Sequence, residues 1–119
     1  MILLVDDDSD AQDMYASYLR SVGCDVFKAA DGAEAVRKAT ELWPNVIVMD
    51  LAMPKMDGWE AIRRLQQSSW TNVIPIIAVS ALADGRDAAF ASGCDAYLMK
   101  PCTPHVLWAQ IQTLLSLAR

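Results

Sequence analysis

Short apolar runs alternate with longer amphipathic segments along the whole chain. Three of these runs, Ile2–Val5, Val46–Met49 and Ile74–Val79, are rich in branched aliphatic residues and show no polar alternation. Such runs are typical of strands that are covered on both faces, as in a parallel sheet. Residues 24–29 alternate apolar and polar side chains, which predicts a strand nearer the edge of the sheet, and residues 96–99 predict a short fifth strand.

Helical periodicity fills the intervals between these predicted strands. In the first interval one face of the helix is apolar, and we expect Ser9 to cap this helix and Gly23 to end it. A second helix is predicted from Gly32 to Trp43, because Pro44 cannot continue it. The apolar face of the first helix is formed by Ala11, Met14, Tyr15, Tyr18, Leu19 and Val22.

Three further helices complete the pattern. The third is expected to start after the turn at Asp57-Gly58, the alanine-rich fourth to run from about Asp84 to Ser92, and the fifth to begin at Thr103-Pro104. Strand and helix alternate throughout, which requires crossover connections and a parallel sheet with helices on both faces. The sequence therefore predicts an α/β fold of three layers in a single domain, residues 1–119.

Composition limits the kind of protein that this sequence can encode. Of its residues, 54% are apolar and 21% are charged, and no apolar stretch approaches the ~20 residues of a membrane span. A net charge of −5 argues against direct binding to nucleic acid, which needs a basic face. Three irregularly spaced cysteines and one histidine fit neither a disulfide framework nor a zinc site. Because no basic leader precedes the first strand, we expect a cytoplasmic protein without membrane contact.

Charged and polar residues stand where the predicted strands end. The first strand is followed by Asp6 and Asp7, the third by Asp50, the fourth by Ser80 and the fifth by Lys100. Ligands of open parallel sheets bind outside the carboxyl ends of the strands. If the strands lie in the order 2-1-3-4-5, these side chains converge at one point.

Carboxylates that converge repel one another unless they are protonated or bridged by a cation. Hard oxygen ligands favour Mg²⁺ as that cation. A Mg²⁺ ion beside a carboxylate, an ammonium and a hydroxyl is the arrangement that phosphoryl transfer onto the carboxylate requires. Asp50 is the expected nucleophile, because aspartyl phosphate forms on an ionised carboxylate. For Asp8, which precedes Ser9, a helix cap or a solvated turn residue is expected instead.

Four segments carry a resemblance to a known family, and it covers essentially the whole chain. In this order and at these separations they resemble the receiver domains of two-component response regulators, which have a CheY-like, flavodoxin-like fold. The resemblance implies a five-stranded parallel sheet in the order 2-1-3-4-5. The segments are ILLVDDDSD (2–10), VIVMDLAMPKMDGWE (46–60), IPIIAVSA (74–81) and GCDAYLMKP (93–101).

The resemblance implies a metal site and a phosphoacceptor. Asp6 and Asp7 would hold Mg²⁺, Asp7 more directly, together with Asp50 and the backbone carbonyl of Ala52. Asp50 would accept the phosphoryl group. Ala52 departs from the family's usual pattern, since many receivers carry a polar side chain at this position.

The resemblance also implies a phosphate-binding lysine and a conformational switch. Lys100 would bind the phosphate, and the bond between Lys100 and Pro101 is often cis in this family. Ser80 would be the switch hydroxyl, and Tyr97 the switch aromatic.

The function implied by the resemblance is signalling rather than turnover of an external substrate. The phosphoryl group would come from a phosphohistidine on a sensor histidine kinase or a histidine phosphotransfer protein, and self-phosphorylation and self-dephosphorylation would be the only reactions. A downstream protein or a second copy would read the face made by the fourth helix, fifth strand and fifth helix. Val106 and Leu117 are apolar residues of that fifth helix which its core stripe does not explain.

Three alternatives remain open from the sequence. A phosphatase of the haloacid-dehalogenase type also uses an aspartate nucleophile at a strand end, but it needs a second acidic residue two positions on, where this chain has Ala52. A receiver that only binds a partner would not need the intact Asp50 and Lys100 positions. A flavodoxin that binds FMN needs a phosphate loop rich in Ser, Thr and Gly after the first strand, which is missing here.

Overall fold

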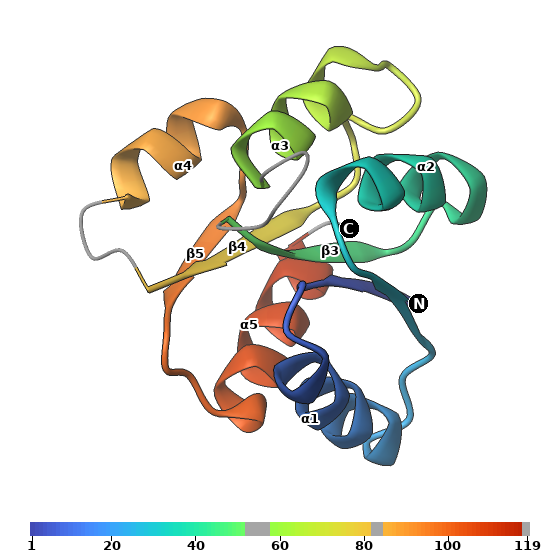
Figure 1. The fold of residues 1–119 in the computed structure, drawn as a ribbon, viewed down its shortest axis with the longest axis vertical. Helices are drawn as coiled ribbons and strands as arrows, with labels where there is room; N and C mark the ends of the chain where they lie inside the picture. The colour runs from blue at the N-terminus through green and yellow to red at the C-terminus, as the bar shows by residue number, and fades with distance from the viewer. Residues whose placement is uncertain (52–57, 82–84, 118–119) are drawn as a thin grey trace.

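The fold is a parallel sheet with helices on both faces (Figure 1). The computed structural model describes residues 1–51, 58–81 and 85–117. The strand order is β2-β1-β3-β4-β5, which confirms the predicted α/β fold and its order. The elements are β1 Ile2–Val5, α1 Ser9–Ser21, β2 Val26–Ala29, α2 Gly32–Leu42, β3 Val46–Asp50, α3 Gly58–Gln67, β4 Ile76–Ser80, α4 Arg86–Ser92, β5 Ala96–Met99 and α5 Pro104–Leu117.

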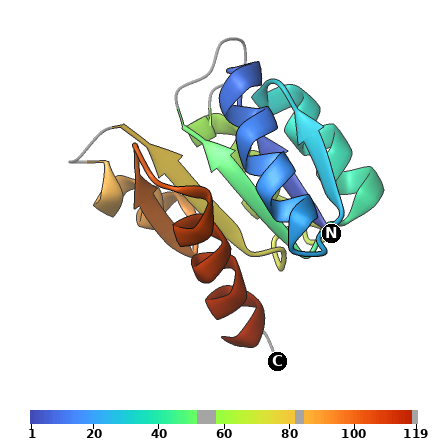
Figure 2. The same ribbon diagram turned by 90° about the horizontal axis from the view of Figure 1, so that it is seen from below.

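Two hydrophobic cores lie on the two faces of the sheet. On one face, α2, α3 and α4 pack against the sheet through small and branched residues such as Ala35, Ile62 and Ala89. On the other face, α1 and α5 lie side by side, with Leu19 and Ile111 fully buried (Figures 1 and 2). The central strands are buried along their whole length, as their continuous apolar sequence predicts. None of the helices in the described ranges has the length and apolar character to span a bilayer.

The face that α1 buries is rotated from the predicted one. Met14 and Val22, which we predicted to face the core, are exposed, so that part of the prediction is wrong. The reason is Gln12, whose side-chain amide donates to the carbonyl oxygens of Leu4 at 3.1 Å and Ala29 at 2.9 Å. Because these hydrogen bonds satisfy a polar side chain inside the protein, the helix can turn it inward. The buried residues of α1 are Gln12, Tyr15, Ala16 and Leu19.

The start of α1 also differs from the prediction. Asp8, not Ser9, is the N-cap, and its carboxylate accepts the backbone N–H groups of Asp10 and Ala11. Aspartate and serine are both favoured as N-caps, and here the helix begins directly after Asp8. The interpretation of Asp8 as a helix cap is therefore confirmed, and that of Ser9 is wrong.

Two strands begin two residues later than predicted. β2 begins at Val26, because the backbone N–H of Cys24 donates to the Leu19 carbonyl and closes the end of α1. β4 begins at Ile76, because Pro75 has no N–H and the Ile76 N–H donates to the carboxylate of Asp95. The predicted start of the fourth helix at Asp84 lies outside the described residues, and the described helix begins at Arg86.

Gly58 allows α3 to pack directly against the end of β3. Its backbone N–H donates to the Leu51 carbonyl at 3.0 Å. A side-chain Cβ at this position would overlap the Asp50 carbonyl oxygen and would lie only 2.5 Å from Leu51 Cα. Both are backbone atoms and cannot move aside without displacing the strand that carries Asp50. A glycine is therefore required here by close approach.

We predict that Gly58→Ala lowers the free energy of unfolding by about 2 kcal/mol or more, because the overlap is with backbone. Gly23→Ala is the matched control: Gly23 has a φ of 98° and nothing within 4 Å of an added Cβ, so only backbone strain of about 1 kcal/mol is expected. Urea unfolding of the two variants measures the difference. Equal losses of stability would contradict the close approach.

Candidate functional site

The sheet brings the polar residues at its strand ends to one edge. The parallel pairing of β1 with β3 places Asp6 beside Asp50. β4 and β5 are paired as far as Ser80 and Met99, and the next N–H group, that of Lys100, donates to the Ser80 carbonyl at 2.7 Å. Side chains up to 94 positions apart in the sequence thus lie at one site.

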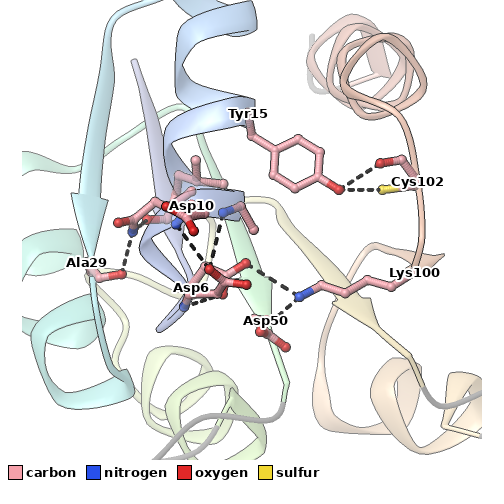
Figure 3. Close-up of polar contacts among 11 residues, drawn as sticks. Asp6, Asp10, Tyr15, Ala29, Asp50, Lys100 and Cys102 are labelled. Atoms are coloured by element: carbon pink, nitrogen blue, oxygen red, sulfur yellow. Dashed lines mark hydrogen bonds and ion pairs between the residues drawn. The ribbon is translucent and has the colours of Figure 1, made fainter.

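Lys100 forms the centre of this site (Figure 3). Its ammonium lies 3.1 Å from Asp50 Oδ2 and 3.5 Å from Asp6 Oδ2. Burial of Lys100 acts to lower its pKa, but the hydrogen bond and charge of Asp50 and the charge of Asp6 outweigh burial and raise it. The lysine therefore remains a cation across the physiological range. The peptide bond between Lys100 and Pro101 is cis.

Asp6 is a buried carboxylate with only 4% of its surface exposed. Its Oδ1 accepts the Asp8 N–H at 2.9 Å, and its backbone N–H donates to the Ala29 carbonyl at 3.1 Å. Burial raises the pKa of Asp6, and the neighbouring charge of Asp50 acts in the same direction. The Asp8 N–H and the charge of Lys100 oppose this rise without cancelling it. Asp6 is thus held in place by backbone and is costly to ionise.

Three carboxylates form a cluster at the site. Oxygen atoms of Asp6, Asp7 and Asp50 all lie within 4.8 Å of one another. Asp6 and Asp50 are buried, whereas Asp7 is exposed. One ammonium cannot neutralise three carboxylates, so the cluster retains excess negative charge when all are ionised. Oxygen donors in this number and spacing suit a hard divalent cation.

The remaining predicted site residues lie near this cluster or outside the described ranges. Ser80 is buried at the end of β4. Tyr97 is half-buried on β5 and packs against the core on the face covered by α3 and α4. The switch roles of both residues stay predictions. Ala52, the predicted carbonyl ligand, lies outside the described residues.

Sequence reasoning missed two residues of α1 that support the site. Gln12 fixes the ends of β1 and β2 through the two carbonyls described above. Tyr15, predicted only as an apolar core residue, donates its hydroxyl to the Cys102 carbonyl at 2.7 Å. The spacing of four residues in α1 could have revealed Gln12. One helical face is complete if a glutamine is accepted among its buried positions; it consists of Gln12, Tyr15, Ala16 and Leu19.

A parallel sheet in this order, with an acidic cluster and a lysine at its carboxyl edge, defines the CheY-like class of flavodoxin-like domains. The chain belongs to the response regulator receiver domain family, whose model matches residues 2–112.

One similar protein is the DNA-binding dual master transcriptional regulator RpaA of Synechocystis sp., which is 36% identical over 116 residues, 96% of this chain and 48% of RpaA. The chain thus spans about half the length of the curated relatives it matches.

Solved receiver structures superpose closely on the fold. A putative response regulator from Chloroflexus aurantiacus has a TM-score of 0.91 at 32% identity, with 97% of this chain and 96% of that chain covered. The receiver domain of sensor histidine kinase PA1611 from Pseudomonas aeruginosa has a TM-score of 0.89 at 34% identity, covering 97% and 96%. In that structure a magnesium ion is coordinated in the active site cleft.

The raised pKa of Asp6 predicts a specific pH dependence of stability. In the unfolded chain Asp6 releases its proton near 3.8, and in the folded protein at higher pH. Between the two values the folded state binds more protons, so stability falls as pH rises through this window. The raised pKa of Lys100 affects stability only at alkaline pH, as its ordinary value is 10.5.

We therefore expect Asp6→Asn to be more stable than the parent at pH 7 without divalent cations, with the advantage shrinking towards pH 4. Urea unfolding in EDTA between pH 4 and pH 7 measures this difference in the free energy of unfolding. Identical pH profiles for the parent and the variant would show that Asp6 ionises without cost in the fold.

Proposed function

We propose that this chain is a phosphorylation-controlled receiver domain in which Asp50 accepts a phosphoryl group from a phosphohistidine on a sensor histidine kinase or histidine phosphotransfer protein. The observation that carries the proposal is the contact of 3.1 Å between the Lys100 ammonium and Asp50 Oδ2, inside the cluster with Asp6 and Asp7. The match to the response regulator receiver domain family supports the same function.

In the proposed reaction an Asp50 carboxylate oxygen attacks the phosphorus of the phosphohistidine. A P–O bond forms as the P–N bond breaks, the electron pair stays on the imidazole nitrogen, and a proton from water keeps that ring neutral. Lys100 already lies within hydrogen-bonding reach of the acceptor and would donate to a phosphoryl oxygen, which stabilises the charge that the transfer places there. The Ser80 hydroxyl would donate to another oxygen. The result is an acyl phosphate on Asp50.

The donor set fits a magnesium ion. Asp6, Asp7 and Asp50 supply closely spaced carboxylate oxygens, and two of the three are already held by burial. Mg²⁺ prefers such hard ligands and usually keeps several waters, which the exposed position of Asp7 allows. When bound, the ion supplies charge neutralisation for the cluster and for the phosphoryl oxygens. Ala52 stays a proposed fourth ligand through its carbonyl.

The proposed output face consists of α4, β5 and α5. Among the described side chains, each contributes one large exposed apolar residue: Phe90, Met99 and Val106, respectively. We propose that phosphorylation draws Ser80 toward Asp50 and lets Tyr97 turn inward, which alters this face for a downstream protein or a second copy.

We expect the chemical shifts of Tyr97 and Val106 to move when beryllofluoride is added. Shifts confined to the Asp50 pocket would contradict the proposed output face. The side chain of Leu117 lies outside the described residues.

The alternatives are less well supported. A phosphatase of the haloacid-dehalogenase type would need an acidic residue at position 52, which is alanine. The family match favours a signalling domain. We propose that self-phosphorylation and self-dephosphorylation are its only reactions. Residues 1–119 would form one receiver domain of a cytoplasmic regulator.

RpaA is named as DNA-binding, but the net charge of −5 here argues that this domain itself does not contact DNA.

We predict that incubation with acetyl phosphate and Mg²⁺ adds one phosphoryl group to the parent protein and none to Asp50→Asn, because the amide is not a nucleophile. Intact-mass spectrometry measures the adduct. Asp10→Asn, which removes an exposed carboxylate from the first turn of α1, is the matched control and should be modified like the parent. Equal modification of Asp50→Asn would exclude Asp50 as the acceptor.

A further inference from the structure

A tyrosine hydroxyl connects α1 to the segment that carries the site lysine. Tyr15 is only 6% exposed, and its hydroxyl donates to the Cys102 carbonyl oxygen at 2.7 Å across 87 positions of sequence. The Cys102 Sγ lies 3.4 Å from the Tyr15 hydroxyl oxygen. Figure 3 shows this contact beside Lys100, with the tyrosine ring projecting from α1 toward the start of α5.

The segment between β5 and α5 is short and is held at both ends. At its start the Lys100 N–H donates to the Ser80 carbonyl, and at its end the Thr103 carbonyl accepts the N–H groups of the first turn of α5. Between these ends, Tyr15 holds the carbonyl two residues beyond Lys100. The lysine side chain is itself 27% exposed, so packing alone does not fix the position of its ammonium. The position of the ammonium depends on its ion pairs with Asp50 and Asp6 and on the backbone from which the side chain projects.

Tyr15 also lies against the site itself. It lines a cavity of about 10 Å³ together with Asp6, Asp50 and Lys100. A cavity of this size holds one water molecule at most, so Tyr15 packs close to the site residues on the side of α1. Burial raises the pKa of Tyr15, and the contact with Cys102 and the charge of Asp6 raise it further. The hydroxyl therefore stays protonated and remains a donor over the whole physiological range.

We propose that Tyr15 is a positioning residue for phosphoryl transfer: by holding the Cys102 carbonyl, it sets the ammonium of Lys100 against Asp50. This inference rests on the proposed function and deepens it. It assigns to α1 a role on the lysine side of the site, in addition to the support that Gln12 gives to the ends of β1 and β2. The acceptor of the tyrosine is a backbone carbonyl, so the effect passes through the backbone to Lys100.

The test is Tyr15→Phe, which removes one oxygen atom and leaves the buried ring. With acetyl phosphate as donor, an Asp50 oxygen attacks phosphorus, the P–O bond to the acetyl group breaks, and acetate leaves with the electron pair. We expect the rate of Asp50 phosphorylation at saturating Mg²⁺ to fall roughly two- to tenfold, the usual range for loss of one hydrogen bond. The Mg²⁺ affinity should not change, because the proposed metal ligands lie at the carboxyl ends of β1 and β3 and not on the segment that carries Lys100.

A double-mutant cycle separates positioning from general destabilisation. In a Lys100→Met background, Tyr15→Phe should have no further effect on the rate, since the group that it positions is gone. Tyr18→Phe is the matched control: Tyr18 is half-buried on the same helix, and its hydroxyl makes no hydrogen bond to any residue in the described ranges. It should react at the parent rate. Urea unfolding confirms that all variants are folded under the assay conditions.

A spectroscopic readout does not depend on the rate. The carbonyl carbon shift of Cys102 should move in Tyr15→Phe and stay in place in Tyr18→Phe. An unchanged rate in Tyr15→Phe, or an equal loss with and without Lys100, would overturn the inference while leaving Asp50 as acceptor. A parent protein that takes up no phosphoryl group would instead overturn the proposed function, and the positioning role with it.

Discussion

Electrostatic repulsion among Asp6, Asp7 and Asp50, whose oxygen atoms lie within 4.8 Å of one another, is the constraint on which the rest of the site depends. Parallel strands deliver these carboxylates to one edge because their carboxyl ends all point the same way. The cluster is tolerated because Lys100 contacts two of its members and because the backbone N–H of Asp8 donates to the Asp6 carboxylate. The residual negative charge of the cluster makes this edge of the sheet a site for a cation. With Lys100 and a cation together, the site can neutralise the charge of a phosphoryl group that is transferred to Asp50.

The fold could be predicted from the sequence because local hydrophobic patterns indicate each strand and helix. Continuous apolar strands, separated by amphipathic helices, leave few arrangements other than a covered parallel sheet. The same reasoning located Asp6, Asp50 and Lys100, since each directly follows or ends a strand. Ser80 was expected directly after the fourth strand and is its last residue, and Tyr97 lies on β5 as expected, but the roles assigned to them concern a second conformation of the site.

What the sequence could not predict are contacts between distant segments and choices between equivalent residues. Gln12 is buried because two strand carbonyls accept from it, and a hydrophobic pattern gives a glutamine no reason to face inward. Asp8 and Ser9 are both good caps, so only the geometry of the turn decides between them. The bond from Tyr15 to the Cys102 carbonyl joins residues 87 positions apart, and its acceptor is backbone, which carries no sequence signal.

Calorimetric titration with Mg²⁺ measures whether Asp6, Asp7 and Asp50 form one cation site. We expect the parent protein to bind one ion and Asp7→Asn to bind it at least about tenfold more weakly, because an oxygen ligand with its charge is lost. Asp8→Asn removes the neighbouring charge but keeps a good helix cap, and should bind Mg²⁺ nearly like the parent. Equal affinities for the parent and Asp7→Asn would show that Asp7 is not a ligand of the cation and that the three carboxylates do not form one site.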